Sequence, residues 1–202
     1  MGDKTSIAVA NSEAAAYGSI MQSFDLIVIG SGPAGQRAAI QAAKSGKRVA
    51  LVEKNECVGG VCINTGTIPS KTMREAVLHL SGYNHQNIYG VNYRVKDKIS
   101  MADLAFRVQH VIRTEIEVTV AQLSRNGIEV LFGAAAFLDP HTIQVTSARG
   151  TVDYHADHVI IGVGTKPACS DKVPINGRTI VNSDQVMQMP EIPRTLIVVG
   201  GA

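Results

Sequence analysis

The sequence contains 202 residues, and 19 lysine and arginine residues nearly balance 17 aspartate and glutamate residues, for a formal net charge of +2. A balance this even excludes charge-driven binding of nucleic acid. The hydrophobic fraction of 45% and the charged fraction of 18% are typical of a globular chain with a buried core, and they exclude a disordered or collagen-like chain. No apolar run reaches the length of about 18 residues that a membrane helix needs, so no membrane span is predicted.

The cysteines and the N-terminus bear on the cellular location. Cys57, Cys62 and Cys169 are too few and too odd in number for a disulfide-stapled secreted scaffold, so we expect a reducing, cytoplasmic location. The six histidines show no metal-ligand spacing, and we predict no metal site. Residues 1–23 lack the basic start and continuous apolar stretch of a secretory signal, and we expect a disordered extension. Met21 directly precedes the first strand, and we hypothesise that translation starts there.

Regular structure begins with a strand, a helix and a second strand. Residues 24–29 are β-formers, the glycine-rich segment 30–35 follows, and an alanine-rich helical segment extends to Lys44. Residues 48–53 form another apolar run and predict the second strand. Because a crossover helix between two buried strands closes only in this way, the unit predicts a parallel sheet.

The middle of the chain is expected to be helical. We predict a glycine-rich loop over residues 58–66 and a helix over residues 69–80. Ser100 and Asp103 have the spacing of a capping box, and apolar residues then recur with the helical period until Asn126-Gly127 ends the segment. This segment is the most strongly predicted helix, and we expect it to pack on the core or on another subunit.

The last third of the chain is expected to consist mainly of strands and connections. Short β-forming runs predict strands at residues 129–132, 137–138, 142–146, 151–154 and 158–163. The short middle strands indicate a β-meander inserted before the chain returns to the main sheet. Residues 166–193 are polar, contain four prolines and predict a connection, and residues 196–199 predict another apolar strand.

The pattern Gly30-x-Gly32-x-x-Gly35 lies between the first strand and the first helix. It places bare backbone N–H groups at a helix N-terminus, where a pyrophosphate can approach closely because glycine has no Cβ. Glu53 ends the second strand, where its carboxylate can accept hydrogen bonds from ribose hydroxyls. The combination predicts dinucleotide binding, and the alternative is a tight turn that only serves packing.

A second motif extends from Gly59 to Lys71 and reads Gly-Gly-Val-Cys-Ile-Asn-Thr-Gly-Thr-Ile-Pro-Ser-Lys. It resembles the GGxCxNxGCxPSK signature of the pyridine nucleotide-disulfide oxidoreductases, the flavoprotein family of glutathione reductase and lipoamide dehydrogenase. Every fixed position matches except one, since Thr67 stands where the family has the cysteine that lies against the flavin. A dithiol relay needs two thiols, so Cys62 alone cannot perform it.

Loss of that cysteine, together with residues 71–77, resembles the soluble pyridine nucleotide transhydrogenases within this family. The resemblance implies an oxidoreductase with FAD as cofactor that passes hydride from NADPH via FAD to NAD. It also implies two catalytic positions, the flavin-facing Thr67 and Lys71. Lys71 would lie beside the reactive flavin nitrogen, where a cation favours the electron-rich reduced ring, and the alternative is a solvated helix lysine.

Two less specific matches to the family complete the set of cofactor-binding positions that the resemblance implies. Ala135 lies in a segment similar to the family turn whose backbone meets the adenine. Gly164 lies in a segment that resembles the family's ATG-[ST]-x-P, although Gly162 and Val163 replace its Ala-Thr. The full predicted set is Gly30, Gly32, Gly35, Glu53, Lys54, Gly60, Cys62, Lys71, Ala135 and Gly164.

The resemblance implies a FAD-binding Rossmann-like parallel sheet with an inserted β-meander, a truncated form of the glutathione reductase-type two-dinucleotide-binding fold. It divides the chain into the extension at 1–23, an incomplete FAD-binding domain at 24–193 and the first strand of a NAD(P)-binding domain at 194–202. A homodimer is expected only if the C-terminal interface domain is present. Two other functions stay open, a lipoamide dehydrogenase-like disulfide reductase in which Cys57 supplies the missing thiol and an inactive flavin-binding remnant.

Overall fold

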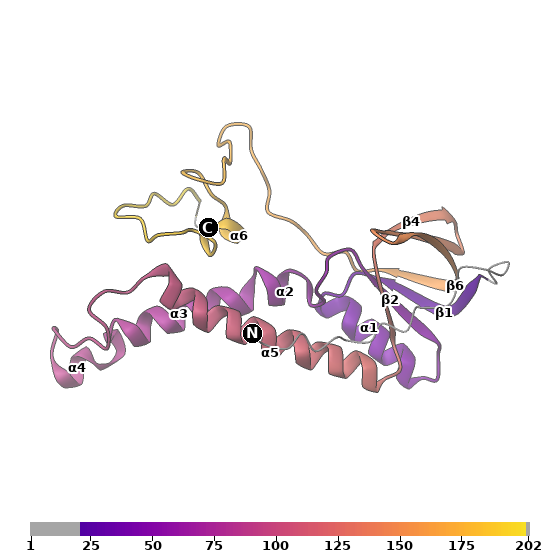
Figure 1. The fold of residues 1–202 in the computed structure, drawn as a ribbon, viewed down its shortest axis with the longest axis horizontal. Coiled ribbons are helices and arrows are strands. Elements are labelled where there is room, and N and C mark those ends of the chain that lie inside the picture. Colours follow the sequence, from indigo (N-terminus) through magenta and orange to yellow (C-terminus); the bar gives the residue numbers. More distant parts are fainter. Residues whose placement is uncertain (1–20, 201–202) are drawn as a thin grey trace.

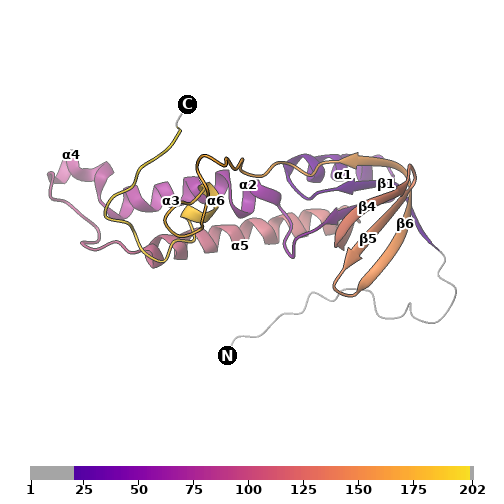
Figure 2. The ribbon, with the colours of Figure 1, turned by 90° about the horizontal axis from the view of Figure 1, so that it is seen from above.

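The computed structural model describes residues 21–200, so residues 1–20 of the predicted extension and the last two residues lie outside the described part. A six-stranded sheet lies at one end of the molecule, and two long helices, α3 (Thr67–Leu80) and α5 (Met101–Arg125), extend away from it (Figure 1). The view turned by 90° shows the same two helices running side by side (Figure 2).

The sheet combines a parallel part with an antiparallel part. Its strands lie in the order β3 (Glu129–Phe132), β2 (Val49–Glu53), β1 (Gln22–Ile29), β6 (Gly150–Ile161), β5 (Thr142–Ser147) and β4 (Ala134–Asp139). The pairs β3–β2, β2–β1 and β1–β6 are parallel, whereas β6–β5 and β5–β4 are antiparallel. The predicted Rossmann-like parallel sheet with a β-meander is therefore confirmed. Strand β1 begins at Gln22, two residues before the predicted start.

The central strands are apolar because both faces of the parallel part are covered. All five residues of β2 are buried, as expected for a strand between two layers. One face packs on α1 (Pro33–Lys44) and the C-terminal part of α5, through Leu26, Val28, Ala39, Val49, Leu51, Val58, Leu123 and Ile128. The other face packs on the meander, through Phe24, Ile27, Ala50, Val52, Leu131, Ile143, Val145, Tyr154 and Ala156.

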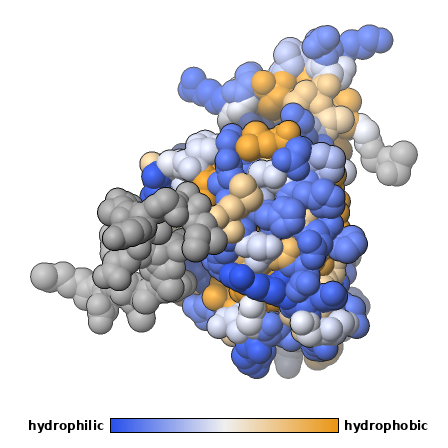
Figure 3. Space-filling model, turned by 90° about the vertical axis from the view of Figure 1, so that its right-hand side faces the viewer, coloured by the Kyte–Doolittle hydropathy of each residue, from blue (hydrophilic) through white to orange (hydrophobic). Residues whose placement is uncertain are grey.

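Alternation along the strands divides these side chains between the two cores, so that neighbours in β1 point to opposite faces. Each fully buried aliphatic side chain stabilises the fold by about 1.5–3 kcal/mol relative to an exposed one. Outside the cores, apolar residues are interspersed with polar ones on the surface at the sheet end of the molecule (Figure 3).

Strand β6 differs from its prediction. The sequence predicted separate strands at 151–154 and 158–163, but β6 is one strand of 12 residues. Its first half pairs with β5 up to His155, and its second half pairs with β1 from Tyr154 onward. One continuous strand thus exchanges its partner without a turn, because residues 155–157 contain no glycine or proline that would interrupt it. The meander is therefore joined to the parallel sheet through β6.

The helical part includes short helices that the sequence did not predict. A helix, α2 (Gly60–Asn64), replaces most of the predicted loop at 58–66, and α3 starts at Thr67 rather than at residue 69. A short 3₁₀ helix, η1 (Tyr83–His85), and α4 (Gln86–Tyr89) follow α3. Segments this short carry too few residues for a hydrophobic period to be visible in the sequence.

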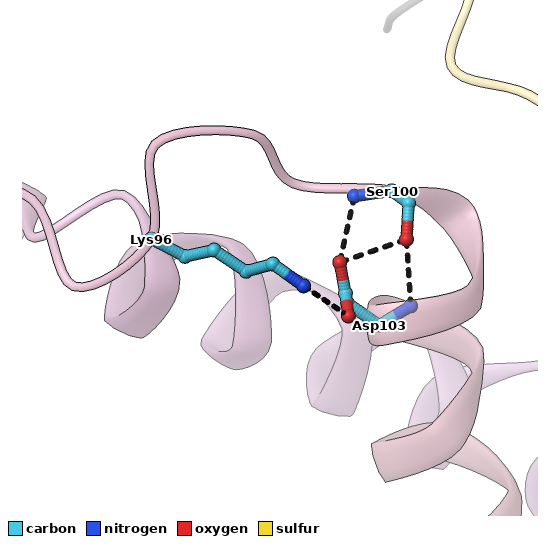
Figure 4. Close-up of polar contacts among 3 residues, drawn as sticks. All are labelled: Lys96, Ser100 and Asp103. Carbon is cyan, nitrogen blue, oxygen red and sulfur yellow. Dashed lines mark hydrogen bonds and ion pairs between the residues drawn. The ribbon is translucent and has the colours of Figure 1, made fainter.

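Helix α5 starts where its capping box predicted (Figure 4). The Ser100 hydroxyl accepts from the Asp103 N–H at 3.3 Å, and the Asp103 carboxylate accepts from the Ser100 N–H at 2.9 Å. The ammonium group of Lys96 lies 2.6 Å from the same carboxylate. The bonds from Lys96 and Ser100 lower the pKa of Asp103 from 3.8 to about 2.

Up to residue 200, where the description ends, the C-terminal part contains one short helix, α6 (Ser183–Val186), whose first turn is capped by the Asn182 side chain. The strand predicted at residues 196–199 is not formed, and the side chains there are exposed. A strand needs a neighbour for its backbone hydrogen bonds, and no strand among the described residues pairs with this segment.

Candidate functional site

The carboxyl ends of the parallel strands meet at one edge of the sheet, where backbone hydrogen bonds hold the exits of the strands together. Gly30, Gly133 and Gly162 each donate their N–H to a carbonyl of the neighbouring strand, at 2.8, 2.9 and 2.7 Å. Strand β1 lies here between β2 on one side and β6 on the other. Open parallel sheets bind their ligands in the crevice at such a point, where the chain turns from one side of the first strand to the other.

The three glycines of the first motif differ in whether the surrounding structure would allow a larger residue. A Cβ on Gly30, where φ is +105°, would overlap the carbonyl of Gly162, and a Cβ on Gly35 would overlap the carbonyl of Gly30. A Cβ on Gly32 would meet nothing within 4 Å. Packing therefore explains Gly30 and Gly35 but not Gly32, which lies at the N-cap of the 12-residue helix α1. The backbone at Gly32 is thus uncovered at the N-terminus of α1, and helix N-termini of this kind are suited to bind phosphate groups.

The second glycine pair lies directly against the first motif. Gly59 and Gly60 have φ values of +111° and +60°, and a Cβ on Gly60 would lie 2.8 Å from the Cα of Gly32. The Gly59 N–H donates to the hydroxyl of Ser31 at 2.9 Å and to its carbonyl at 3.2 Å. The two glycine motifs, which are separate in the sequence, therefore form one continuous wall around the N-terminus of α1.

Glu53 lies beside this wall and is already hydrogen-bonded by the protein. The residue is only 5% exposed. Its Oε2 accepts from the Ser31 hydroxyl at 2.5 Å and from the Ser31 N–H at 3.1 Å. Its Oε1 accepts from the backbone and side-chain nitrogens of Asn55 at 2.9 and 3.0 Å. The carboxylate is thus held at the end of β2 by groups from two loops.

The structure brings together five of the predicted cofactor-binding residues at this edge: Gly30, Gly32, Gly35, Glu53 and Gly60. Cys62 is half-buried on α2, next to this group along the chain. Lys54 is exposed directly after β2. Ala135 is half-buried in β4, paired with Val145, and Gly164 is exposed beyond the end of β6 with φ +67°.

Thr67 and Lys71 lie on the first turns of α3, and both are exposed. Lys71 lies at a groove of about 490 Å³ between α3 and α5, which is lined by Lys71, Thr72, Glu75, Ala76, His79, Leu80, Asp103 and Arg107. The groove carries both signs of charge. Among the described residues, no hydrogen bond joins the Lys71 side chain to the glycine motifs or to Glu53.

Sequence reasoning missed two polar residues of the site, Ser31 and Asn55. Ser31 is 0% exposed and joins the first glycine motif to Glu53 and to Gly59. The available signal was a small polar residue between two glycines, directly after a buried strand. The sequence could not show that this hydroxyl would meet a carboxylate from the next strand.

The cysteines and helices add three observations. All three thiols, Cys57, Cys62 and Cys169, are free, and Cys57 is exposed. No group of three potential ligands among the described residues could hold a metal ion. Within the same part of the chain, no helix has the length and apolar character needed to cross a membrane.

The sequence that builds this edge matches a known family over most of the chain. Residues 24–202 match the model of the family described as pyridine nucleotide-disulphide oxidoreductase. The chain belongs to this family. The resemblance inferred from the motif at residues 59–71 is therefore confirmed.

Curated relatives within the pyridine nucleotide-disulphide oxidoreductase family share the transhydrogenase name. Soluble pyridine nucleotide transhydrogenases of Mycobacterium bovis and Mycobacterium tuberculosis are 48% identical to the chain over 182 residues. The match covers 89% of this chain and 39% of the relatives. A soluble pyridine nucleotide transhydrogenase of Photorhabdus laumondii is 38% identical over 178 residues, covering 88% of the chain and 38% of the relative. The chain thus spans about two fifths of the length of these proteins.

Solved structures of similar fold agree with this result. The Cu(II) complex of the HOCl-induced flavoprotein disulfide reductase RclA from Escherichia coli superimposes with a TM-score of 0.69 and 26% identity. The alignment covers 86% of this chain and 36% of that structure. The chain is therefore similar in fold to a flavoprotein, again over only part of the larger molecule.

Proposed function

We propose that the chain forms the FAD-binding part of a soluble transhydrogenase-type flavoenzyme, which passes hydride from NADPH via FAD to NAD. The observation that carries the proposal is the space at Gly32. Gly30 and Gly35 have packing reasons to be glycine, whereas Gly32 has none and lies before the N-terminus of α1. A diphosphate at this place explains the glycine at position 32, because it would come close to the bare backbone.

Each part of the site then has a role in holding the cofactor. The N–H groups of α1 and the adjacent glycine backbone would bind the diphosphate, and Glu53 would accept hydrogen bonds from the ribose of the adenosine. Lys54, Ala135 and Gly164 are the other positions at which we expect the chain to contact the cofactor. The chemistry that FAD supplies when bound is reversible two-electron hydride transfer, and the protein contributes binding, orientation and exclusion of water.

The residue at position 67 supports the choice of reaction. Thr67 provides a hydroxyl at the start of α3 where a disulfide reductase needs a thiol, and a hydroxyl cannot exchange with a disulfide. Cys62 would then be a small side chain beside the cofactor rather than a redox group. Lys71, one turn after Thr67, would place a cation near the ring and favour its reduced, electron-rich state.

The test uses the full-length polypeptide. After purification with bound flavin, we expect hydride exchange from NADPH to an NAD analogue with a shifted absorbance, and no new thiols after anaerobic reduction by NADPH. The Thr67→Cys variant is the positive control for thiol detection, and Thr67→Ser keeps the hydroxyl. Two new thiols per flavin in the unaltered protein would favour a disulfide reductase that uses Cys57. A colourless protein that stays apo with added FAD would favour the inactive remnant.

A second variant tests the diphosphate position directly. Gly32→Ala places a methyl group in open space, so we expect a small change in stability, below about 1 kcal/mol, which reflects the weaker N-cap. The same methyl group would occupy the diphosphate position, and the affinity for FAD should fall at least about tenfold. Unchanged affinity with unchanged folding would contradict binding at this site.

Three further assignments belong to the same proposal. Residues 24–193 would form most of the FAD-binding domain, and residues 194–202 would begin a NAD(P)-binding domain. A homodimer would form through an interface domain of the longer relatives, and size-exclusion chromatography with light scattering of the full-length protein tests it. The free cysteines fit a location in the reducing cytoplasm, which fractionation of the source cells would test.

A further inference from the structure

The side-chain amide of Asn55 donates a hydrogen bond to the Glu53 carboxylate at 3.0 Å. Glu53 accepts four hydrogen bonds, two on each oxygen, from Ser31 and Asn55. An ionised carboxylate offers about four lone-pair positions. The protein's own donors therefore use all of its acceptor capacity, and a ribose hydroxyl can bind only if it replaces one of these four donors.

The hydrogen bonds to the two oxygens of Glu53 differ in how easily they can be broken. Oε2 is bound by Ser31, which is fully buried and whose hydroxyl also accepts the N–H of Gly59 at 2.9 Å. Removing Ser31 from Oε2 would disturb the second glycine loop and leave buried polar groups without partners, which is costly. Ser31 is thus the fixed donor of the pair.

Oε1 is held by a residue that can leave. Asn55 is exposed, so its side-chain amide can turn into water and exchange its hydrogen bond without leaving a buried group unpaired. The backbone N–H of Asn55 is fixed by the chain and stays within 2.9 Å of the same oxygen. Of the four donors, the Asn55 side-chain amide is the one whose departure disturbs the fewest other contacts.

We infer that Asn55 is a displaceable occupant of the ribose position, which a ribose hydroxyl replaces on Oε1, while Ser31 fixes the carboxylate through Oε2. The inference rests on the proposed function, because it assumes that the site binds the adenosine part of FAD. Asn55 lowers the affinity for the nucleotide by competing for the same oxygen. Ser31 is a positioning residue that acts through Glu53 and Gly59.

The experiment measures nucleotide binding to the full-length protein after its flavin has been removed. ADP and 2′,3′-dideoxy-ADP are the probes, because they share the diphosphate and the adenine and differ only in the ribose hydroxyls. We expect Asn55→Ala to bind ADP about 2- to 10-fold more tightly than the unaltered protein, the amount that corresponds to one net hydrogen bond. Its affinity for dideoxy-ADP should not change, since this ligand makes no use of Oε1.

Two further variants make the result specific. Asn92→Ala removes an exposed asparagine from the connection after α4 and should leave both affinities unchanged. Ser31→Ala should weaken ADP binding at least about tenfold, because Glu53 and the Gly59 N–H each lose a partner. The loss should be smaller for dideoxy-ADP, which distinguishes a positioning role from a general loss of folding.

The outcomes separate the inference from the proposed function. Equal or weaker ADP binding by Asn55→Ala overturns the inference, and so does a gain of the same size for both probes. If the unaltered protein binds neither ADP nor FAD, the proposed function itself fails. A gain that is confined to ADP supports both.

Discussion

Two segments of this chain have almost the same sequence and opposite structures. Residues 26–30 read Leu-Ile-Val-Ile-Gly, and residues 196–200 read Leu-Ile-Val-Val-Gly. In the first segment Ile27 and Val28 are 0% exposed, whereas Ile197 and Val198 are 88% and 75% exposed. The closing glycines even share their backbone conformation, with φ +105° at Gly30 and +106° at Gly200.

The difference lies in the neighbours. The first segment is paired on both sides, with β2 and β6, and is covered on both faces. No described strand pairs with the second segment, and it has no regular structure. A preference for the β conformation therefore reflects how well side chains fit a pleated, partly buried surface, and it forms no strand by itself.

The largest expected effect comes from the glycines that close the two segments. Gly30→Ala would place a Cβ onto the Gly162 carbonyl at a positive φ, and we expect a loss of about 4 kcal/mol of unfolding free energy. Gly200→Ala has the same φ but open space around it, and we expect a loss of only about 1–2 kcal/mol, from the strain at positive φ alone. Urea unfolding of both variants measures the contrast. Equal losses would show that strain at φ, and not the packing against β6, makes Gly30 necessary.

The next effect compares two isoleucines at matching positions. Ile27→Ala removes a fully buried side chain between β1 and the meander, and we expect a loss of about 3–4 kcal/mol. Ile197→Ala removes an exposed side chain and should change the unfolding free energy by less than about 0.5 kcal/mol. A large loss at Ile197 in the full-length protein would show that the second segment is packed there against another part of the molecule.

The same contrast explains how much the sequence could predict. Signals that act within a few residues were correct, such as the capping box of Ser100 and Asp103 and the glycine turn that ends α5. Signals that depend on distant partners led to two kinds of error, a strand that was predicted but is not formed and a single strand that was predicted as two. The strand predicted at 196–199 has no neighbour among the described strands to pair with. Strand β6 was predicted as two strands, because its own sequence does not show that it pairs first with β5 and then with β1.

The candidate site follows the same rule. Sequence alone placed Gly32 and Glu53 in one site, because a strand, a loop and a helix of known lengths fix their relation. It did not give the bond between Ser31 and Glu53, which joins residues from two different strand ends. The roles of Thr67 and Lys71 stay predictions, since they concern contacts with a bound cofactor.

The cap of α5 offers a smaller effect that needs no distant partner. Ser100→Ala removes the acceptor for the Asp103 N–H, and we expect a loss of about 1 kcal/mol. The Asp103 carboxylate has a pKa of about 2 in the folded chain against 3.8 as the ordinary value. Because the folded pKa is lower, its contribution is complete above pH 3.8 and disappears as the pH falls towards about 2.

The measurement for this cap is the stability difference between the unaltered chain and Asp103→Asn as a function of pH. We expect the difference to shrink on acidification through this window. Asp97→Asn is the matched control, since Asp97 is exposed and next to Lys96 in the chain. A difference that is independent of pH would show that the charge of Asp103 does not stabilise the helix start.

The smallest expected effect has the opposite sign and concerns Gly162, which directly follows β6. A Cβ on Gly162 would lie 3.5 Å from Gly35 and from the carbonyl of Ile29, which is ordinary van der Waals contact, and its φ is not in the positive range. Gly162→Ala should therefore stabilise the chain by about 0.5 kcal/mol, because alanine reduces the freedom of the unfolded chain. Gly164→Ala, at φ +67°, should instead destabilise it by about 1 kcal/mol. If Gly162→Ala destabilises the chain as much as Gly164→Ala, then the segment after β6 needs glycine at both positions.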